Sequence, residues 1–128
     1  MKFTSVWFIG ALMTISAVAY TQPTYDPECY AKAQYAQDAQ RCNQIRHQHF
    51  DRILNQSYQA LLKKQSKTGQ KSLRQIQRAW LQERDDVCHE LVAKAVVSAG
   101  QIGDACFADW TEERALTMRV WLQKNKRF

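Results

Sequence analysis

Four cysteines restrict this chain more than any other feature of its sequence. Cys29, Cys42, Cys88 and Cys106 lie within 128 residues, and no two of them have C-x-x-C spacing. An even number of cysteines in a short chain with an export signal predicts two disulfides. A disulfide that closes a loop of about 15 residues contributes about 3 kcal/mol to the free energy of unfolding in the chain-entropy model. Two of them would therefore supply a large part of the stability of one small domain.

A metal site is the alternative use of these cysteines, and the histidines argue against it. His47 and His49 are two residues apart, so they point in different directions on a helix. His89 merely follows Cys88. A structural metal ion needs a set of ligands at suitable spacing. The sequence therefore predicts neither a metal nor another cofactor.

The export signal rests on the first 19 residues. Lys2 is followed by an uncharged apolar run that ends in Ala17-Val18-Ala19, the pattern of a secretory signal peptide. A membrane anchor is the alternative, but the run is short for a span, which needs about 20 residues. We expect a signal peptide at 1–19, an N-terminal extension at 20–26 and no membrane span. The protein is then periplasmic or secreted.

The chain is basic, with 18 Lys and Arg against 12 Asp and Glu. Removal of Lys2 with the signal peptide would leave 17 basic residues and a net charge of about +5. Such a balance argues mildly for an anionic envelope component as a partner, although an ordinary solvated surface is the interpretation we favour. The export signal and the absence of a binding motif disfavour nucleic acid.

The remaining sequence predicts helices alone. Ala, Gln, Leu, Lys and Arg are abundant, and no segment has the alternation of a strand. Glycines place the breaks near 66–71 and 99–103. We expect a short helix opened by Asp26-Pro27-Glu28, and a second start capped by Asp38. Later helices should open near Ser72 and Asp104, followed by a frayed tail at 123–128.

The predicted fold is all-α: a small bundle of three long helices plus a short N-terminal helix, stapled by two disulfides. The turn around Gly69 should fold the first two of the three long helices into a hairpin, with the helix of residues 73–88 at its centre. A bend near Asp38 would bring Cys29 to Cys42, and a turn through Gly100 and Gly103 would bring Cys88 to Cys106. We favour this connectivity, although the other two stay open.

Four short motifs then resemble a known family. They read LNQSY, LRQIQRAW, RDDVC and TEER, and their marked residues are Leu54, Asn55, Tyr58, Gln77, Trp80, Arg84, Asp85, Thr111 and Arg114. In this order, with four cysteines and an export signal, they resemble the lysozyme-inhibitor LprI-like N-terminal domain family. The resemblance implies a helical, exported, disulfide-bonded domain at 27–122, and a lysozyme-like glycosidase as partner.

Two of these residues, Gln77 and Arg84, occupy the apolar side of an amphipathic helix. A buried polar group without a partner costs roughly 2–7 kcal/mol. One interpretation is an internal network, in which Arg84 or Arg114 pairs with an acid and Gln77 with Asn55 or a carbonyl. The candidate acids are Asp51, Asp85 and Asp109. The other interpretation is a half-exposed groove that binds a partner, and we favour the internal network.

Catalysis has little support in the sequence. Asp85-Asp86 and Glu112-Glu113 are adjacent carboxylates, which point about 100° apart on a helix and form no facing acid/base pair. Trp80, Trp110 and Trp121 have core spacing rather than that of a ligand platform. We expect a non-enzymatic protein-binding module that inhibits lysozyme by occluding its cleft. The alternative is an envelope structural or stress protein that binds anionic wall or lipid components through a basic surface.

Overall fold

A computed structural model describes residues 23–128, so the predicted signal peptide at 1–19 lies outside the described residues. The described part folds into α1 (Cys29–Lys32), α2 (Ala36–Lys63), α3 (Lys67–Lys94) and α4 (Ala99–Gln123). Disulfides join Cys29 to Cys42 and Cys88 to Cys106. No strand occurs between residues 23 and 128. The predicted class, three long helices plus a short one with two disulfides, is therefore confirmed.

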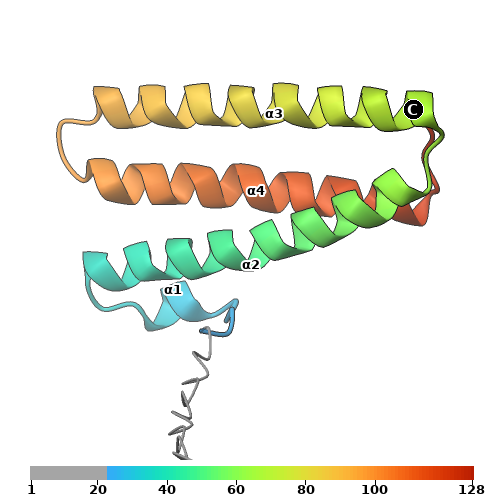
Figure 1. Cartoon of the computed structure of the whole chain (residues 1–128). Helices are drawn as coiled ribbons and strands as arrows, with labels where there is room; N and C mark the ends of the chain where they lie inside the picture. The colour runs from blue at the N-terminus through green and yellow to red at the C-terminus, as the bar shows by residue number, and fades with distance from the viewer. Residues whose placement is uncertain (1–22) are drawn as a thin grey trace, which may run out of the picture.

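The order of the three long helices differs from the prediction. Figure 1 shows α4 between α2 and α3, and direct contacts between α2 and α3 are few. The helices α2 and α3 are joined by the predicted short turn, but each packs mainly against α4 and not along the other, so α4 rather than α3 is central. The physical reason is that α4 has small buried residues on two sides: Ala108, Thr111 and Ala115 share one face, and Gly103 and Cys106 meet α3 on another. They let both neighbours approach it closely.

The two turns lie a few residues earlier than the glycines predict, at 64–66 and 95–98. The hydroxyl of Ser66 accepts a hydrogen bond from the Gly69 amide at 3.1 Å and starts α3 before that glycine. Gly69 lies inside α3. A Cβ at this position would come 2.9 Å from the Phe128 carbonyl oxygen, so a glycine leaves room for the end of the chain. Gly103 lies inside α4, where a Cβ would come 2.9 Å from Val92 Cγ2. Both glycines permit close packing and break no helix.

The start of α2 also differs in detail. Asp38 does not precede the helix; it occupies the third position and its carboxylate accepts from the Gln34 and Tyr35 amides at 3.1 and 3.0 Å. This contact closes the helix end from inside, as in a capping box. The bend that separates α1 from α2 therefore lies at residues 33–35, and it allows Cys29 and Cys42 to approach to 5.8 Å between Cα atoms.

The apolar core lies in the half of the bundle that contains the α2–α3 turn. Its buried members come from all three long helices: Phe50, Leu54, Leu61, Leu73, Ala115 and Met118. Residues 23–128 contain no helix with the length and apolar character of a membrane span.

The final residues fold back instead of fraying. The buried Gln65 side chain donates to the Lys126 carbonyl at 2.9 Å and accepts from the Phe128 amide at 3.3 Å. The Phe128 ring packs edge-on against Trp121, with 5.3 Å between centroids. Because Gln65 has these partners, its burial carries no unpaired polar group, and the tail is held against the core.

We predict that the disulfide between α3 and α4 contributes directly to global stability. The variant Cys88→Ala/Cys106→Ala should lose about 3 kcal/mol in free energy of unfolding, because the unfolded chain regains loop freedom. Urea unfolding would measure this loss. Cys29→Ala/Cys42→Ala is the matched control: it should speed amide exchange in α1, where no residue is buried, more than in α4. Equal exchange effects on α1 and α4 would contradict this assignment.

Candidate functional site

Gln77 and Arg114 form a buried polar pair between α3 and α4. Arg114 Nε donates to Gln77 Oε1 at 3.1 Å, and each residue is only 9 % exposed. The Arg114 guanidinium also lies over the rings of Trp80 and Trp121, with Cζ 5.4 and 4.9 Å from the centroids. Burial lowers the pKa of Arg114. Gln77 therefore has an arginine as its partner, where Asn55 or a carbonyl was predicted.

Arg84 occupies the next part of the same interface. Its Nε and Nη2 both donate to Asp85 Oδ1, at 2.9 and 2.7 Å, and Nη1 lies 3.5 Å from Thr111 Oγ1. The guanidinium packs over Trp80 and Phe107, with Cζ 5.2 and 5.3 Å from the ring centroids. Of the acids predicted as partners, Asp85 is the one that Arg84 contacts. These side chains satisfy one another inside the bundle.

The other family-motif residues line a groove between α2 and α3. This groove has a volume of about 290 Å³ and is lined by Asp51, Leu54, Asn55, Tyr58, Arg74, Gln77, Arg78 and Leu81. Asn55 donates to Asp51 at 3.0 Å on its rim. The structure thus divides the nine family-motif residues into two groups. Leu54, Asn55 and Tyr58 of α2 meet Gln77 of α3 at the groove, and the other five lie at the α3–α4 interface. Amide, phenol and guanidinium groups suit binding rather than bond cleavage.

The α3–α4 turn forms an apolar tip, which sequence analysis missed. Val96 and Val97 are 96 % and 75 % exposed, and Leu91 and Ile102 on the flanking helices are also exposed. Ser98 has a left-handed backbone, with φ of 59°, and ends the turn. We call these four apolar residues the apolar tip. The signal was present as the pair Val96-Val97, but its exposure depends on the turn lying at 95–98.

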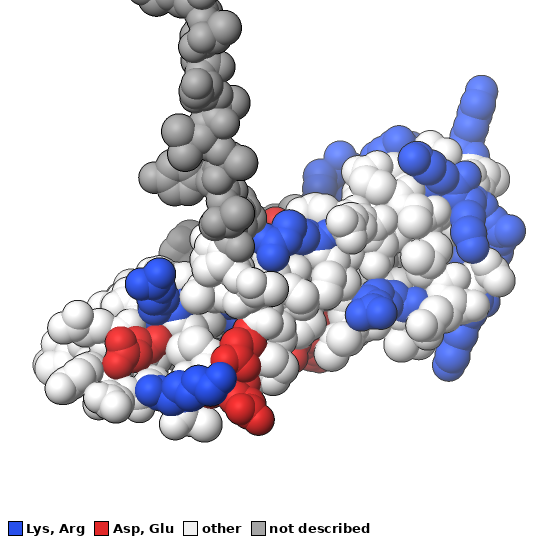
Figure 2. All heavy atoms as spheres, turned by 90° about the horizontal axis from the view of Figure 1, so that it is seen from below, with Lys and Arg blue, Asp and Glu red and all other residues white. Residues whose placement is uncertain are grey.

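Charge is divided between the two ends of the bundle. Segments 52–82 and 114–128 hold 12 of the 18 Lys and Arg and none of the 12 Asp and Glu. The helices bring these segments to the end that contains the α2–α3 turn and the C-terminus, and Figure 2 shows the basic side chains gathered there. All 12 acids lie in segments 23–51 and 83–113 with five basic residues. The apolar tip belongs to this acidic half.

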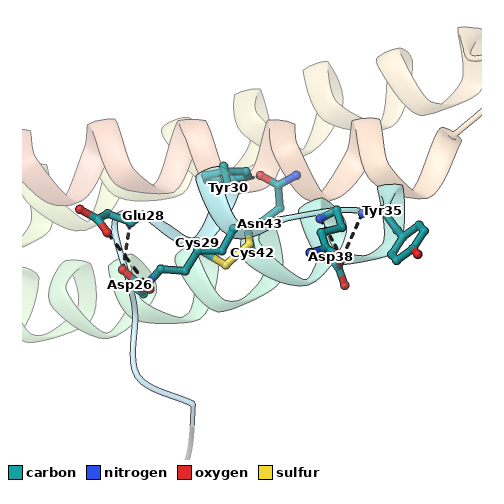
Figure 3. The surroundings of a disulfide bond; sticks show 10 residues. Asp26, Glu28, Cys29, Tyr30, Tyr35, Asp38, Cys42 and Asn43 are labelled. Carbon is teal, nitrogen blue, oxygen red and sulfur yellow. Dashed lines mark hydrogen bonds and ion pairs between the residues drawn. A yellow bond between two sulfur atoms is a disulfide. The ribbon is translucent and has the colours of Figure 1, made fainter.

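A second polar network holds the N-terminal segment to the bundle. Around the Cys29–Cys42 disulfide, the Tyr30 hydroxyl donates to Asn43 Oδ1 (Figure 3). Arg46 lies 5.7 Å from the Tyr30 ring centroid and forms ion pairs with Asp109 and Glu112 of α4. Asp109, which was a predicted partner of Arg84 or Arg114, is therefore used by Arg46.

The acidic and histidine side chains of the described residues are dispersed. Among residues 23–128, no three His, Cys, Asp or Glu side chains are grouped so that they could hold a metal ion. The half-buried His47 lies beside Phe107, with 6.1 Å between ring centroids, and its Nε2 accepts no hydrogen bond from the described residues. Its surroundings are those of a packed side chain.

We predict that Gln77 and Arg114 are energetically coupled. Gln77→Leu leaves a buried arginine without its acceptor, and Arg114→Leu leaves a buried carbonyl oxygen without its donor, so each should lose about 2 kcal/mol. The double variant should lose less than the sum by about 1 kcal/mol or more, as urea unfolding would measure. Gln75→Leu, on the exposed side of α3, is the control and should change stability little. If the loss of the double variant equals the sum of the two single losses, Gln77 and Arg114 are not energetically coupled.

Stability should also fall in mild acid because of His47. Burial lowers the pKa of His47 from its ordinary value of 6.5, and Arg84 acts in the same direction, while Asp51 and Asp104 oppose it. The unfolded chain then binds this proton more readily, so the free energy of unfolding should decrease as pH falls below about 6.5. Urea unfolding at pH 7.5 and 5.5 would measure the slope. His47→Gln should flatten it; an unchanged slope would contradict the assignment.

Comparison with known proteins now confirms the resemblance of the motifs. A family model described as lysozyme inhibitor LprI matches residues 29–118, a range that includes both disulfides, the groove and the apolar tip. Curated proteins and solved structures gave no significant match. Together with the two disulfides, the family indicates an extracytoplasmic protein. The matched range is more than half of the chain, and the protein therefore belongs to the lysozyme inhibitor LprI family.

Proposed function

We propose that this protein is a non-enzymatic inhibitor that binds lysozyme-type glycosidases and occludes their cleft, in the periplasm or after secretion. The observation that carries the proposal is the family match over residues 29–118. Inhibition by occlusion needs only a stable surface that fits the target. Most polar groups of the α3–α4 interface find partners within the protein, although the buried Arg114 Nη2 has no hydrogen-bond partner among the described residues. We therefore assign the family-motif residues Trp80, Arg84, Thr111 and Arg114 a structural role.

The apolar tip is the part of the molecule best suited to enter a cleft. It lies at the far end of the α3–α4 hairpin, on the left of Figure 1, and presents Val96 and Val97 to solvent. The Cys88–Cys106 disulfide closes the same hairpin, with 5.6 Å between Cα atoms. A loop that is held in shape before binding loses less conformational entropy on association. Exposed valines on a braced turn therefore favour tight contact with a concave surface.

The charge division supports a basic target. Animal lysozymes are commonly basic, so the positive net charge of this chain alone argues against association with them. The apolar tip, however, belongs to the half that contains all 12 acids and only five basic residues. Complementary charge near a contact surface steers encounter and raises the association rate. The acidic half would lead in an encounter with a basic enzyme, and the basic half would point away.

A lysozyme assay with tip variants tests this function. Purified protein should inhibit at least one of the chicken-, goose- or invertebrate-type enzymes in a saturable, stoichiometric manner. Val96→Asp/Val97→Asp should reduce affinity at least about tenfold, because two apolar anchors become charged. Leu116→Asp/Val120→Asp is the matched control: these α4 residues are 46 % and 43 % exposed and lie away from the tip.

Two outcomes would contradict the proposal. Absence of inhibition of all three enzyme types at micromolar protein would exclude lysozyme as the target. Equal loss of inhibition in the tip variant and the α4 variant, with both still folded by circular dichroism, would remove the tip from the contact. Inhibition that continues at substoichiometric protein would indicate turnover and exclude simple occlusion.

A further inference from the structure

The end of the bundle opposite the apolar tip is a concentrated cationic surface. It is formed by the end of α2, the start of α3 and the chain after α4, and its exposed residues are Lys63, Lys64, Lys67, Lys71, Lys124, Lys126 and Arg127. We call these seven residues the basic pole. Three separate segments contribute to it, so its charge density results from the fold.

Within residues 23–128, no carboxylate pairs with the cations of the basic pole. Segments 52–82 and 114–128 contain no acid, and within residues 23–128 no ion pair is formed by Lys67 or Lys71. Lys64 contacts only a neutral group of the pole itself, the Asn125 side chain, at 2.9 Å. Like charges at this density repel one another and destabilise the folded state. A cluster with that cost and no carboxylate partner among the described residues points to an external anion.

The position of Lys67 strengthens this argument. It is the first residue of α3, where the helix dipole favours an acid, and the first turn of α3 contains no acid. A cation there is unfavourable by a few tenths of a kcal/mol to about 1 kcal/mol. Glu or Asp at this position would stabilise the folded state more than Lys67 does. The lysine is explained if an anionic surface lies against the helix start.

We propose that the basic pole is a peripheral binding site for a membrane surface that carries anionic phospholipids. None of the three described grooves is lined by a residue of the pole, so the pole meets a flat surface more readily than it encloses a chain. Six of its seven cations are lysines, which attract headgroup phosphates as point charges without a fixed fork geometry. Clusters of this size are typical of binding to anionic lipid, at about 1 kcal/mol per residue near the surface.

An aromatic pair beside the pole suits the same partner. Lys126 Nζ lies 4.1 Å from the Trp121 ring centroid and 5.1 Å from that of Phe128. Both rings are half-buried at the end of the bundle. Tryptophan prefers the level of the headgroups because its ring is largely apolar and carries one polar N–H group, and the Phe128 ring adds apolar surface beside it. The proposed contact leaves the apolar tip, at the other end, directed away from the membrane.

Vesicle cosedimentation tests this site with the folded protein. The protein should bind vesicles of phosphatidylcholine with about one-third phosphatidylglycerol, but not phosphatidylcholine alone, and salt should weaken the binding. Lys67→Glu/Lys71→Glu should lower the partition coefficient at least about tenfold. Arg41→Glu/Lys94→Glu makes the same change of net charge in the other half and should lower it by no more than about threefold. Circular dichroism would verify that both variants are folded.

Several results would overturn the proposal. These are no binding of the unaltered protein to the anionic vesicles, equal losses in the two charge-reversed variants, or binding of soluble polyphosphate without binding of vesicles. The lysozyme assay separates this site from the proposed inhibition. The Lys67→Glu/Lys71→Glu variant should inhibit lysozyme in solution as well as the unaltered protein, so either proposal can fail alone.

Discussion

The close packing of α4 between α2 and α3 is the constraint on which the rest of this structure depends. Small or narrow side chains at Ala108, Thr111 and Ala115 keep one face of α4 low, and on the other side Gly103 lets Val92 of α3 lie against the helix backbone. That arrangement places Arg114 beside Gln77 of α3 and between the rings of Trp80 and Trp121. It also sends the α3–α4 turn to one end and the α2–α3 turn to the other. Tip, groove and pole all follow from the central position of α4.

Much of the fold was predictable because its signals are local. Helix-forming composition, four cysteines and a bend near Asp38 were enough for the helix number and both disulfides. The turn positions were not, because glycines such as Gly69 and Gly103 in a helical sequence predict helix breaks. In the structure each of them makes room for a group distant in sequence, the Phe128 carbonyl and the Val92 methyl. A glycine that serves tertiary packing has the same local pattern as a glycine that ends a helix.

The candidate site was predictable only in part, for the same reason. Gln77 and Arg84 were recognised as buried polar groups, but their partners depend on which helix faces them. Asp85 is adjacent in sequence and was among the candidates, whereas the pairing of Gln77 with Arg114 joins two helices. A break at 99–103 leaves Val96 and Val97 in the preceding helix, whereas in the structure they lie in the turn at 95–98. The charge division is visible in the sequence as two segments without acids, yet only the fold joins them.

The two halves of the bundle are held together by different means. The apolar core, from Phe50 and Leu73 to Met118, lies toward the basic half, whereas both disulfides lie in the acidic half. The apolar packing inside the basic half does not depend on whether the cysteines are oxidised or reduced. A reducing environment would therefore remove the covalent constraints of the acidic half, including the brace on the apolar tip, and leave the apolar contacts of the basic half in place. The redox state of the surroundings thus sets how well one end of the molecule keeps its shape.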